Sequence, residues 1–317
     1  MSASHAADPT QGQALSVAAK TAALASDIKL AHSVFALPFA LIGALLAADD
    51  AQVPIRTLLG QLTLIVVCMV AARTWAMVVN RMADRRFDAR NARTAGRAFA
   101  SGKLDPKDGW IALAVSAFVF LMGTAGFWVL FGNPWPLAAA PALLAWLAFY
   151  SFTKRFTAAC HLVLGVALAL SPIASAIAVS GLDAVSTQPN AAALWALFGM
   201  ITFWVAGFDV IYALADRDFD RENRLRSLPA ALGWNGAAFA SLAMHFAAAG
   251  ALITSAALSP TLGIAFAIAT GITVALLITE HAVLALRRER GLNTAFFTLN
   301  GLVAIALGVA GVIDLVI

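Results

Sequence analysis

Long apolar stretches separated by short polar segments make up most of the chain. Nine of these stretches each contain about 20 mainly apolar residues, the length that an α-helix needs to cross the hydrocarbon core of a bilayer. They span residues 30–48, 58–80, 109–131, 134–152, 158–180, 193–215, 232–256, 260–282 and 294–316. The pattern therefore predicts an all-α polytopic membrane protein with nine transmembrane helices.

The chain before the first stretch has a different character. Residues 1–13 are small and polar and are expected to be disordered, whereas residues 14–29 mix Ala and Leu with three charged side chains. Such a mixture favours a helix that lies on the membrane surface. We therefore expect an N-terminal tail and interfacial segment over residues 1–29, followed by a single transmembrane domain over residues 30–316.

Composition indicates that lipid is the main solvent of the chain. Hydrophobic residues make up 61% of the 317 residues and charged residues only 12%, against roughly 25% charged residues in an ordinary soluble protein. A soluble enzyme, a disordered chain and a coiled coil are therefore excluded. Cys68 and Cys160 both lie in apolar runs, so neither a disulfide framework nor a cysteine metal cluster is expected.

The basic residues set the expected topology. With nine helices, 19 of the 21 Lys and Arg residues fall on one side of the membrane, while Arg56 lies on the other side and Arg73 lies inside the second helix. An excess of Lys and Arg is typical of cytoplasmic loops. We therefore expect a cytoplasmic N-terminus and an external C-terminus. The net charge of +4 then reflects these loops and does not indicate a nucleic-acid partner.

Two acidic clusters stand at helix ends on the expected cytoplasmic side. They read N80-R-M-A-D84-R-R-F-D88 and D209-V-I-Y212-A-L-A-D216-R-D-F-D220. They share the string D-R-x-F-D at a separation of 132 residues, and four predicted helices separate them. The chain is therefore interpreted as a parallel duplication of a four-helix unit with a ninth helix added.

Residues four apart on a helix share one face. Asn80, Asp84 and Asp88 are thus predicted to form one ladder, about 12 Å long at 1.5 Å per residue. A second ladder is predicted from Asp209, Tyr212, Asp216 and Asp220, while Asp218 falls on the opposite face. Magnesium suits such oxygen ligands, because it is usually held by one or two carboxylates together with substrate phosphates. The alternative is a solvated network of Arg–Asp pairs at the helix ends.

This pair of motifs resembles the UbiA superfamily of intramembrane prenyltransferases, most of all its 4-hydroxybenzoate polyprenyltransferase branch. The resemblance extends over nearly the whole chain and includes H32-S-V-F-A-L-P-F, R93-T-A-G-R97 and Y150-S-F-T-K154-R155-F-T. The family usually has Asn-Asp at the start of the first motif, whereas this chain has N80-R81. That departure removes one acidic group and leaves the first ladder intact.

The resemblance implies a fold and a reaction. UbiA-like proteins have nine transmembrane helices around a cavity that opens into the bilayer, and here the cytoplasmic cap would be formed by residues 81–108 and 216–231. Magnesium bridges the acidic motifs and a polyprenyl diphosphate, the diphosphate leaves, and an aromatic ring attacks the allylic cation. The implied partners are these two substrates and the lipid of a bacterial-type inner membrane, with no obligate protein partner.

Candidate roles follow for individual residues. The metal candidates are Asn80, Asp84, Asp88, Asp216 and Asp220. The candidates for binding diphosphate are four cations and one phenol: Arg93, Lys154, Arg226, Arg73 and Tyr212. The fixed cations would neutralise the charge of the leaving diphosphate. By resemblance, Arg155 binds the carboxylate of the acceptor and Asp209 lies near its phenol. The alternatives are orientation signals for the loop arginines, a helix-end ion pair between Arg155 and Asp209, and a hydrogen-bonded core position for His161.

The sequence is consistent with one favoured function and leaves alternatives open. The favoured function is magnesium-dependent transfer of a polyprenyl group to 4-hydroxybenzoate in ubiquinone biosynthesis, and the alternative acceptor is 1,4-dihydroxy-6-naphthoate in a menaquinone route. A CDP-alcohol phosphotransferase would require a D-G-x-x-A-R element, which the sequence lacks. A transporter would suit the helix repeat, but its site is expected near the middle of the membrane and not at one surface.

Overall fold

The computed structural model describes residues 16–28, 36–292 and 294–316, and every regular element within these ranges is a helix. The predicted tail over residues 1–13 and residues 30–35 of the first predicted span lie outside the described residues. His32 lies outside them as well. The expected all-α fold is confirmed.

Eleven α-helices are described, and shorter helical turns join some of them. The α-helices are α1 (Val17–Asp27), α2 (Leu37–Asp50), α3 (Ile55–Asp88), α4 (Pro106–Phe131), α5 (Trp135–Thr153), α6 (Cys160–Ser180), α7 (Ala191–Ala213), α8 (Arg217–Glu222), α9 (Leu228–Leu258), α10 (Ile264–Arg287) and α11 (Asn300–Val316). The 3-10 turns are Gly181–Val185, Leu214–Asp216 and Arg288–Gly291, and a π-helical turn covers Thr294–Leu299.

Eight described helices are long and apolar enough to cross a membrane, and each coincides with one of the predicted spans. The remaining predicted span, residues 30–48, corresponds to α2, of which 14 residues are described. A multi-pass membrane protein is therefore confirmed. The segment 14–29, where a surface helix is expected, contains the helix α1.

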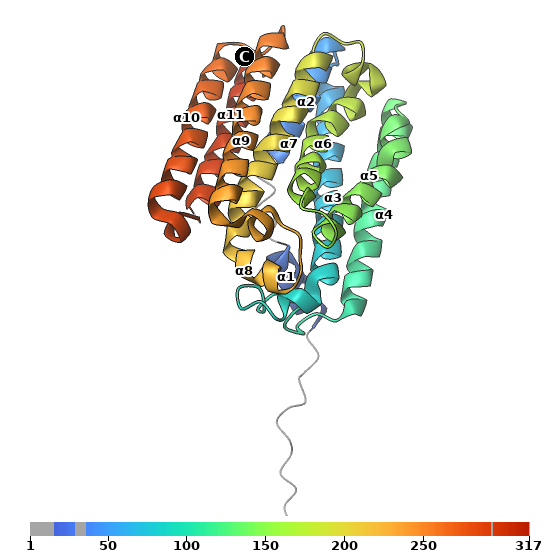
Figure 1. The fold of residues 1–317 in the computed structure, drawn as a ribbon. Coiled ribbons are helices and arrows are strands. Elements are labelled where there is room, and N and C mark those ends of the chain that lie inside the picture. Colours follow the sequence, from blue (N-terminus) through green and yellow to red (C-terminus); the bar gives the residue numbers. More distant parts are fainter. Residues whose placement is uncertain (1–15, 29–35, 293, 317) are drawn as a thin grey trace, which may run out of the picture.

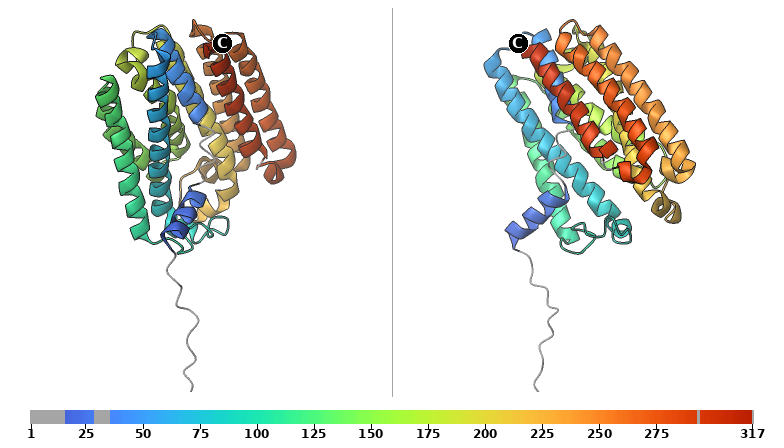
Figure 2. Two further views of the ribbon diagram at one scale, coloured as in Figure 1. Left: turned by 180° about the vertical axis from the view of Figure 1, so that it is seen from behind. Right: turned by 90° about the vertical axis from the view of Figure 1, so that its left-hand side faces the viewer.

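The long helices run side by side between two ends of the molecule (Figure 1). In one part α3 contacts α4 and α5, and in the other α7 packs between α6 and α9. The contacts α2–α6, α2–α11 and α10–α11 join the parts into one bundle. In Figure 2, α1 lies across the lower end of this bundle, beside the segment that follows α3.

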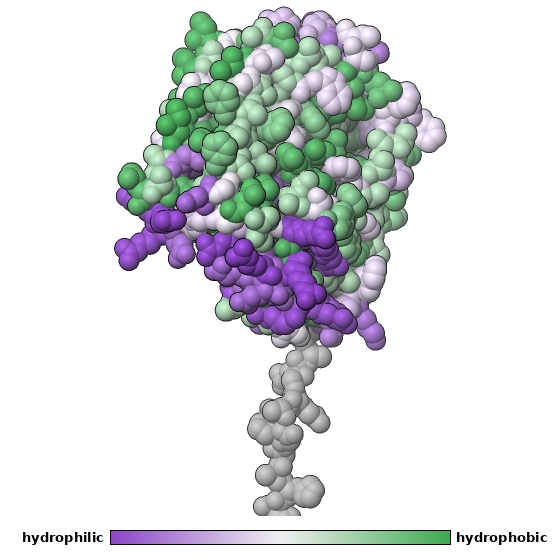
Figure 3. Space-filling view, viewed as in Figure 1, coloured by the Kyte–Doolittle hydropathy of each residue, from purple (hydrophilic) through white to green (hydrophobic). Residues whose placement is uncertain are grey.

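One end of the bundle is polar, and we call it the polar end: α1, α8 and residues 89–105. Figure 3 shows hydrophilic residues gathered at this end, with apolar residues over the upper faces. Large apolar side chains such as Phe246 and Ile264 are about 80% exposed on those faces. Such exposure is expected where lipid replaces water as the surrounding solvent.

Helix ends at the polar end follow local sequence signals. Asp105 and Asp108 form a capping box at the start of α4, and Pro106 occupies the first turn, where its missing N–H costs nothing. Ser227 caps α9 by accepting a hydrogen bond from the N–H of Ala230. These caps fix where the polar segments end and the membrane helices begin.

Helices in the centre of the bundle approach one another through glycine. A Cβ atom at Gly43 in α2 would lie 2.2 Å from the carbonyl oxygen of Pro172 in α6. A Cβ atom at Gly165 in α6 would lie 2.2 Å from the carbonyl oxygen of Thr202 in α7. Small residues allow such close backbone packing in membranes. The chain of contacts α2–α6–α7 that supports the second acidic cluster therefore depends on these two glycines.

A buried polar network links four helices in the second half of the bundle. Asn300 donates to Glu280 Oε1 at 3.0 Å and accepts a hydrogen bond from the Trp204 indole at 2.5 Å. His245 lies 3.0 Å from His281 through their ring nitrogens. Glu280 and Asn300 are at most 1% exposed. Buried polar side chains inside a membrane domain are stable only when paired in this way.

The glycine contact yields a stability prediction. Gly165→Ala introduces a Cβ that overlaps backbone and not a movable side chain, so we expect the free energy of unfolding to fall by about 1–3 kcal/mol. Thermal unfolding in detergent should show a lower midpoint for this variant. Gly271→Ala is the matched control, because a Cβ there meets nothing within 4 Å. Equal midpoints for the two variants would contradict the close α6–α7 contact.

Candidate active site at the polar end

The first acidic cluster lies on one continuous helix. α3 extends to Asp88, eight residues beyond the predicted span that ended at residue 80. Asn80, Asp84 and Asp88 therefore occupy successive turns of one face, and Asn80 Nδ2 lies 3.5 Å from Asp84 Oδ2. The predicted first ladder is present. Residues 81–88, expected as part of a cap loop, are helical.

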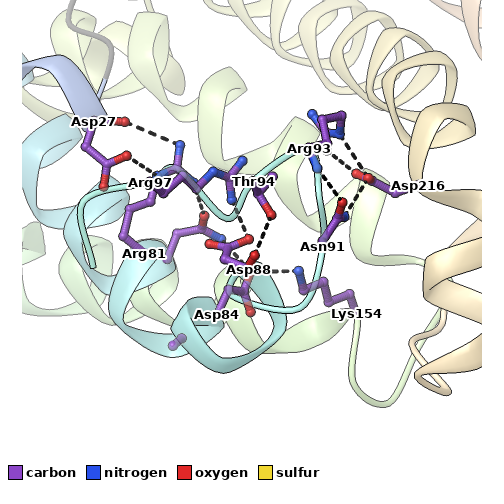
Figure 4. Close-up of polar contacts among 12 residues, drawn as sticks. Asp27, Arg81, Asp84, Asp88, Asn91, Arg93, Thr94, Arg97, Lys154 and Asp216 are labelled. Atoms are coloured by element: carbon purple, nitrogen blue, oxygen red, sulfur yellow. Dashed lines mark hydrogen bonds and ion pairs between the residues drawn. The ribbon is translucent and has the colours of Figure 1, made fainter. Parts of the chain in front are cut away.

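Asp84 is buried and is held by two cations from the end of α5. Lys154 Nζ lies 2.6 Å from Asp84 Oδ2, and Arg155 Nη2 lies 3.4 Å from Asp84 Oδ1. Arg155 also donates to the Ala83 carbonyl at 2.7 Å. Only 3% of the Asp84 side chain is exposed. Lys154 and Arg155, which directly follow α5, thus connect the end of that helix to the first acidic cluster (Figure 4).

Asp88 is held from the opposite direction by the loop that follows it. Arg97 Nη1 donates to Asp88 Oδ1 at 2.7 Å, and the Thr94 hydroxyl donates to the Asp88 carbonyl at 3.2 Å. The other carboxylate oxygen, Oδ2, is buried and has no hydrogen-bond partner. A buried, unsatisfied carboxylate oxygen has a free-energy cost that a bound cation would remove.

The second acidic cluster lies across a break in its helix. α7 ends at Ala213, a 3-10 turn covers Leu214–Asp216, and the short helix α8 begins at Arg217. A 3-10 turn has three residues per turn, so the regular α-helical spacing on which the predicted ladder depends is interrupted between Tyr212 and Asp216. Asp209 remains within α7, Asp216 is the N-cap residue of α8, and Asp220 lies inside α8.

Asp216 receives its partners from the loop that follows the first cluster. Arg93 forms an ion pair with it through both Nε and Nη2, with Nε at 2.9 Å from Oδ1, and Asn91 donates to the same oxygen at 2.9 Å. The structure therefore brings the two acidic clusters together, although they are 132 residues apart in the sequence. The two clusters are connected by the segment that begins after Asp88 and contains Asn91 and Arg93 (Figure 4).

Arg93 also joins Tyr212 to this link. Its Nη1 donates to the Tyr212 hydroxyl, and its guanidinium lies 4.7 Å from the centre of that ring. Burial alone would lower the pKa of Arg93, but the hydrogen bond and charge of Asp216, together with Tyr212, outweigh burial and raise the pKa above its usual range. Arg93 is a permanent cation between the two clusters.

The last two acidic candidates occupy separate positions. Asp220 is buried, and Lys154, Asp216 and His161 lie within electrostatic range of it. Asp209 forms a 2.7 Å hydrogen bond with His161, and 24% of its side chain is exposed. The alternative ion pair between Arg155 and Asp209 is absent, because Arg155 pairs with Asp84.

A cavity of about 320 Å³ lies beside the two clusters. Its lining is strongly basic and includes residues of α1, α3, α7 and the segment after α3. Among the lining residues are Arg81, Arg93, Arg97, Lys103, Thr94, Tyr212, Ser26 and Asp27. Two candidates for binding diphosphate, Arg93 and Tyr212, therefore line one cavity. Sequence analysis missed Arg81, Arg97 and Lys103, because the same segment contains many basic residues that are equally consistent with orientation signals.

The other candidates for binding diphosphate do not line this cavity. Lys154 contacts Asp84, and Arg226 donates to the Phe156 carbonyl at 2.9 Å while its backbone N–H donates to the Lys154 carbonyl at 2.6 Å. Arg73 lies in α3 two turns before Asn80, within electrostatic range of Tyr150 and Arg81. Through these two hydrogen bonds, Arg226 connects the segment before α9 to the segment after α5.

The donor set is suitable for magnesium. It consists of carboxylate and amide oxygens, and Asp88 contributes a buried oxygen without a partner. Within residues 16–28, 36–292 and 294–316, no three His, Cys, Asp or Glu side chains form a candidate metal site by themselves. Magnesium does not require three, since one or two carboxylates and substrate phosphates usually complete its shell.

Comparison with known proteins decides the family. The model of the UbiA prenyltransferase family matches residues 36–302, which include both acidic clusters and all residues that line the basic cavity except those of α1. The chain belongs to the UbiA prenyltransferase family. It is 36% identical over 169 residues to 4-hydroxybenzoate octaprenyltransferase of Saccharophagus degradans, covering 52% of each chain. The chain thus spans about half the length of the first curated relatives that it matches.

Solved structures of the family share the fold. A UbiA homolog from Aeropyrum pernix K1 in its apo form superposes with a TM-score of 0.78 and 32% identity, covering 90% of this chain and 98% of that one. A UbiA homolog from Archaeoglobus fulgidus bound to GPP and Mg²⁺ superposes with a TM-score of 0.66 and 15% identity, covering 94% and 100% of the two chains. The latter likeness concerns the fold alone.

The buried Asp84 pair yields a second stability prediction. Lys154→Ala leaves Asp84 buried with only the longer contacts to Arg155 and Asn80, so we expect the free energy of unfolding to fall by about 1–3 kcal/mol. Adding Asp84→Asn should restore much of the loss, because the unpaired charge is removed. Chemical denaturation in detergent measures both. Arg217→Ala is the control, since its partner Asp218 is 71% exposed and such surface pairs contribute little. A loss no larger than that of the control would show that the pair is unimportant.

Proposed function

We propose that this protein transfers a polyprenyl group from a polyprenyl diphosphate to an aromatic acid. The proposed acceptor is 4-hydroxybenzoate, and the product is 3-polyprenyl-4-hydroxybenzoate, an intermediate of ubiquinone biosynthesis. Membership of the UbiA prenyltransferase family and the similarity to 4-hydroxybenzoate octaprenyltransferases support this proposal.

The observation that carries the proposal is the basic cavity beside the two acidic clusters. Arg93 and Arg97 line it, and each is paired with a carboxylate of a different cluster. A diphosphate is a dense anion that Arg binds through two parallel N–H groups. Cations in the cavity with carboxylates paired directly behind them suit a diphosphate and its metal ions.

The proposed cofactor is Mg²⁺, and a related fold has been solved with GPP and Mg²⁺. The residues proposed to hold it are Asn80, Asp84, Asp88, Asp216 and Asp220. When bound, magnesium supplies positive charge that stabilises the leaving diphosphate. The protein itself holds Asp84, Asp88 and Asp216 in place by pairing them with Lys154, Arg97 and Arg93.

The remaining site residues have proposed roles in binding and orientation. Arg93, Lys154, Arg226 and Arg73 neutralise the diphosphate, with Arg81 and Arg97 added from the cavity lining, and Tyr212 holds Arg93 in place. Arg155 binds the carboxylate of the acceptor. Asp209 orients the phenol and stabilises positive charge that develops on the ring during attack.

The proposed setting is a bacterial-type inner membrane. Residues 30–316 form one transmembrane domain, and residues 1–29 are a tail and interfacial segment. Hydrophilic residues gather at the polar end (Figure 3), and the segments there include many Lys and Arg residues, so the proposed orientation places this end in the cytoplasm. The partners are the two substrates and the lipid, with neither nucleic acid nor an obligate protein partner.

A product assay tests the proposal. Membranes that contain this chain are supplied with Mg²⁺, geranyl or octaprenyl diphosphate, and either 4-hydroxybenzoate or 1,4-dihydroxy-6-naphthoate, with EDTA in a parallel set. We expect an EDTA-sensitive prenylated 4-hydroxybenzoate. Product from the naphthoate alone would replace the acceptor and assign a menaquinone route. If folded protein makes no product with any pair of substrates, the proposed reaction is wrong and the transporter hypothesis is favoured.

The metal-ligand assignment predicts the effect of a conservative substitution. Asp84→Asn removes the charge of a proposed ligand and keeps its shape, so turnover should fall at least a hundredfold while the protein stays folded. Initial rates and thermal unfolding are measured on the same preparation. Asp218→Asn is the control from the second motif, because Asp218 is exposed and pairs only with its neighbour Arg217 among the described contacts. Full activity in Asp84→Asn would contradict the assignment.

The acceptor-binding role predicts a split between the two substrates. Arg155→Ala removes the cation proposed to bind the acceptor carboxylate, so KM for the aromatic acid should rise about tenfold, as expected for a lost charge-assisted hydrogen bond. KM for the prenyl diphosphate should change little. Steady-state kinetics with one substrate varied at a time separates the two effects. A rise confined to the KM of the donor would assign Arg155 to the diphosphate.

A further inference from the structure

One buried histidine contacts the proposed active site, yet the proposed reaction gives it no task. His161 is the second residue of α6, and its side chain is only 3% exposed. Its ring reaches two other elements. Nδ1 lies 2.7 Å from Asp209 Oδ2 in α7, and the backbone N–H of Leu228, the first residue of α9, points at Nε2 from 3.3 Å.

These two contacts select one tautomer of the ring. The Leu228 N–H is a donor and requires an acceptor, so Nε2 is unprotonated. The ring proton of the neutral imidazole is then on Nδ1, where it is donated to the Asp209 carboxylate. Leu228 is at the first turn of α9, where a backbone N–H has no acceptor within its own helix. Both ring nitrogens are therefore engaged, and the ring cannot flip without losing both hydrogen bonds.

We propose that His161 is a positioning residue that holds the Asp209 carboxylate in one orientation toward the aromatic acceptor. This inference rests on the proposed function, in which Asp209 orients the phenol. His161 engages one oxygen from a buried position, while 24% of the Asp209 side chain remains exposed. The carboxylate is thus fixed on its buried side and open on the other. Hydrogen-bonded partners of this kind set the orientation of a functional group and affect activity without touching substrate.

The same ring ties Asp209 to the segment that follows the second acidic cluster. Cys160, next to His161, is 3.5 Å from the carbonyl oxygen of Arg226, and Leu228 follows two residues after Arg226. The backbone of Arg226 is in turn bonded to Lys154. The Asp209 carboxylate is therefore oriented relative to the residues proposed to bind the diphosphate. Such coupling would align the acceptor ring with the carbon that it attacks.

The test compares two substitutions at position 161. His161→Leu keeps the volume and removes both hydrogen bonds, so kcat/KM for 4-hydroxybenzoate should fall tenfold or more, whereas KM for the prenyl diphosphate should stay within about twofold. In His161→Asn the side-chain amide nitrogen takes about the place of Nδ1 and donates to Asp209. This variant should recover most of the activity.

Controls separate positioning from a loss of stability. Gln61→Leu removes another buried hydrogen bond, from Gln61 to the Val179 carbonyl, near the start of α3 and far from Asp88 along that helix. It should lower the unfolding midpoint and leave kcat/KM of the folded fraction unchanged. Asp209→Asn, measured alongside, reports whether that carboxylate matters at all.

The outcomes distinguish this inference from the proposed function. Wild-type membranes that make no prenylated acid would overturn the proposed function itself. Active wild type with an inactive Asp209→Asn, but with His161→Leu as active as wild type, would overturn the positioning role alone. If His161→Leu does not fold, His161→Asn decides: near-normal kinetics support the inference, and a folded variant with a tenfold loss in kcat/KM for the acceptor contradicts it.

Discussion

Charged side chains at the edge of a bilayer must be paired, and this constraint organises the polar end of the molecule. Asp84, Asp88 and Asp216 are each held by a cation that comes from a different segment of the chain. Because none of these three carboxylates has its cation in its own helix, the paired arrangement forms only when the helices and the segments that follow them come together. The pairing that makes the polar end stable is therefore the same pairing that assembles the candidate site.

The ion pairs also explain how one set of residues can serve a charged substrate. A diphosphate with its metal ions brings both signs of charge. In the proposed function, Arg93 and Arg97 would pair with phosphate oxygens, and the carboxylates that they release would hold the metal. The number of buried charges without a partner then stays low throughout. In a site with acidic groups alone, the carboxylates would repel one another when no metal is bound. A site with cations alone would bind any anion.

Hydropathy and motif spacing were sufficient to predict the membrane helices and the first ladder, because both depend on helical periodicity alone. The 3-10 turn at Leu214–Asp216 interrupts the regular helix predicted for the second ladder, and it is not visible in a pattern of acidic residues. His161 is buried and hydrogen-bonded as expected for a core position, but its partner Asp209 is 48 residues away and only tertiary packing identifies it. Arg81 and Arg97 were indistinguishable from other loop arginines until the cavity that they line was located.

Position 81 shows how packing compensates for a local change of charge. The resemblance to the family leads one to expect an acidic residue there, and this chain has Arg81, which is buried. Its guanidinium lies 3.7 Å from the Asp27 carboxylate of α1 and 3.0 Å from the Asn80 side chain. A carboxylate absent from α3 is thus supplied by the interfacial helix, and Ile28 packs with Val78 and Leu113 beneath it. Because Asp27 and Arg81 both line the basic cavity, α1 is a structural part of the candidate site and not only an anchor at the membrane surface.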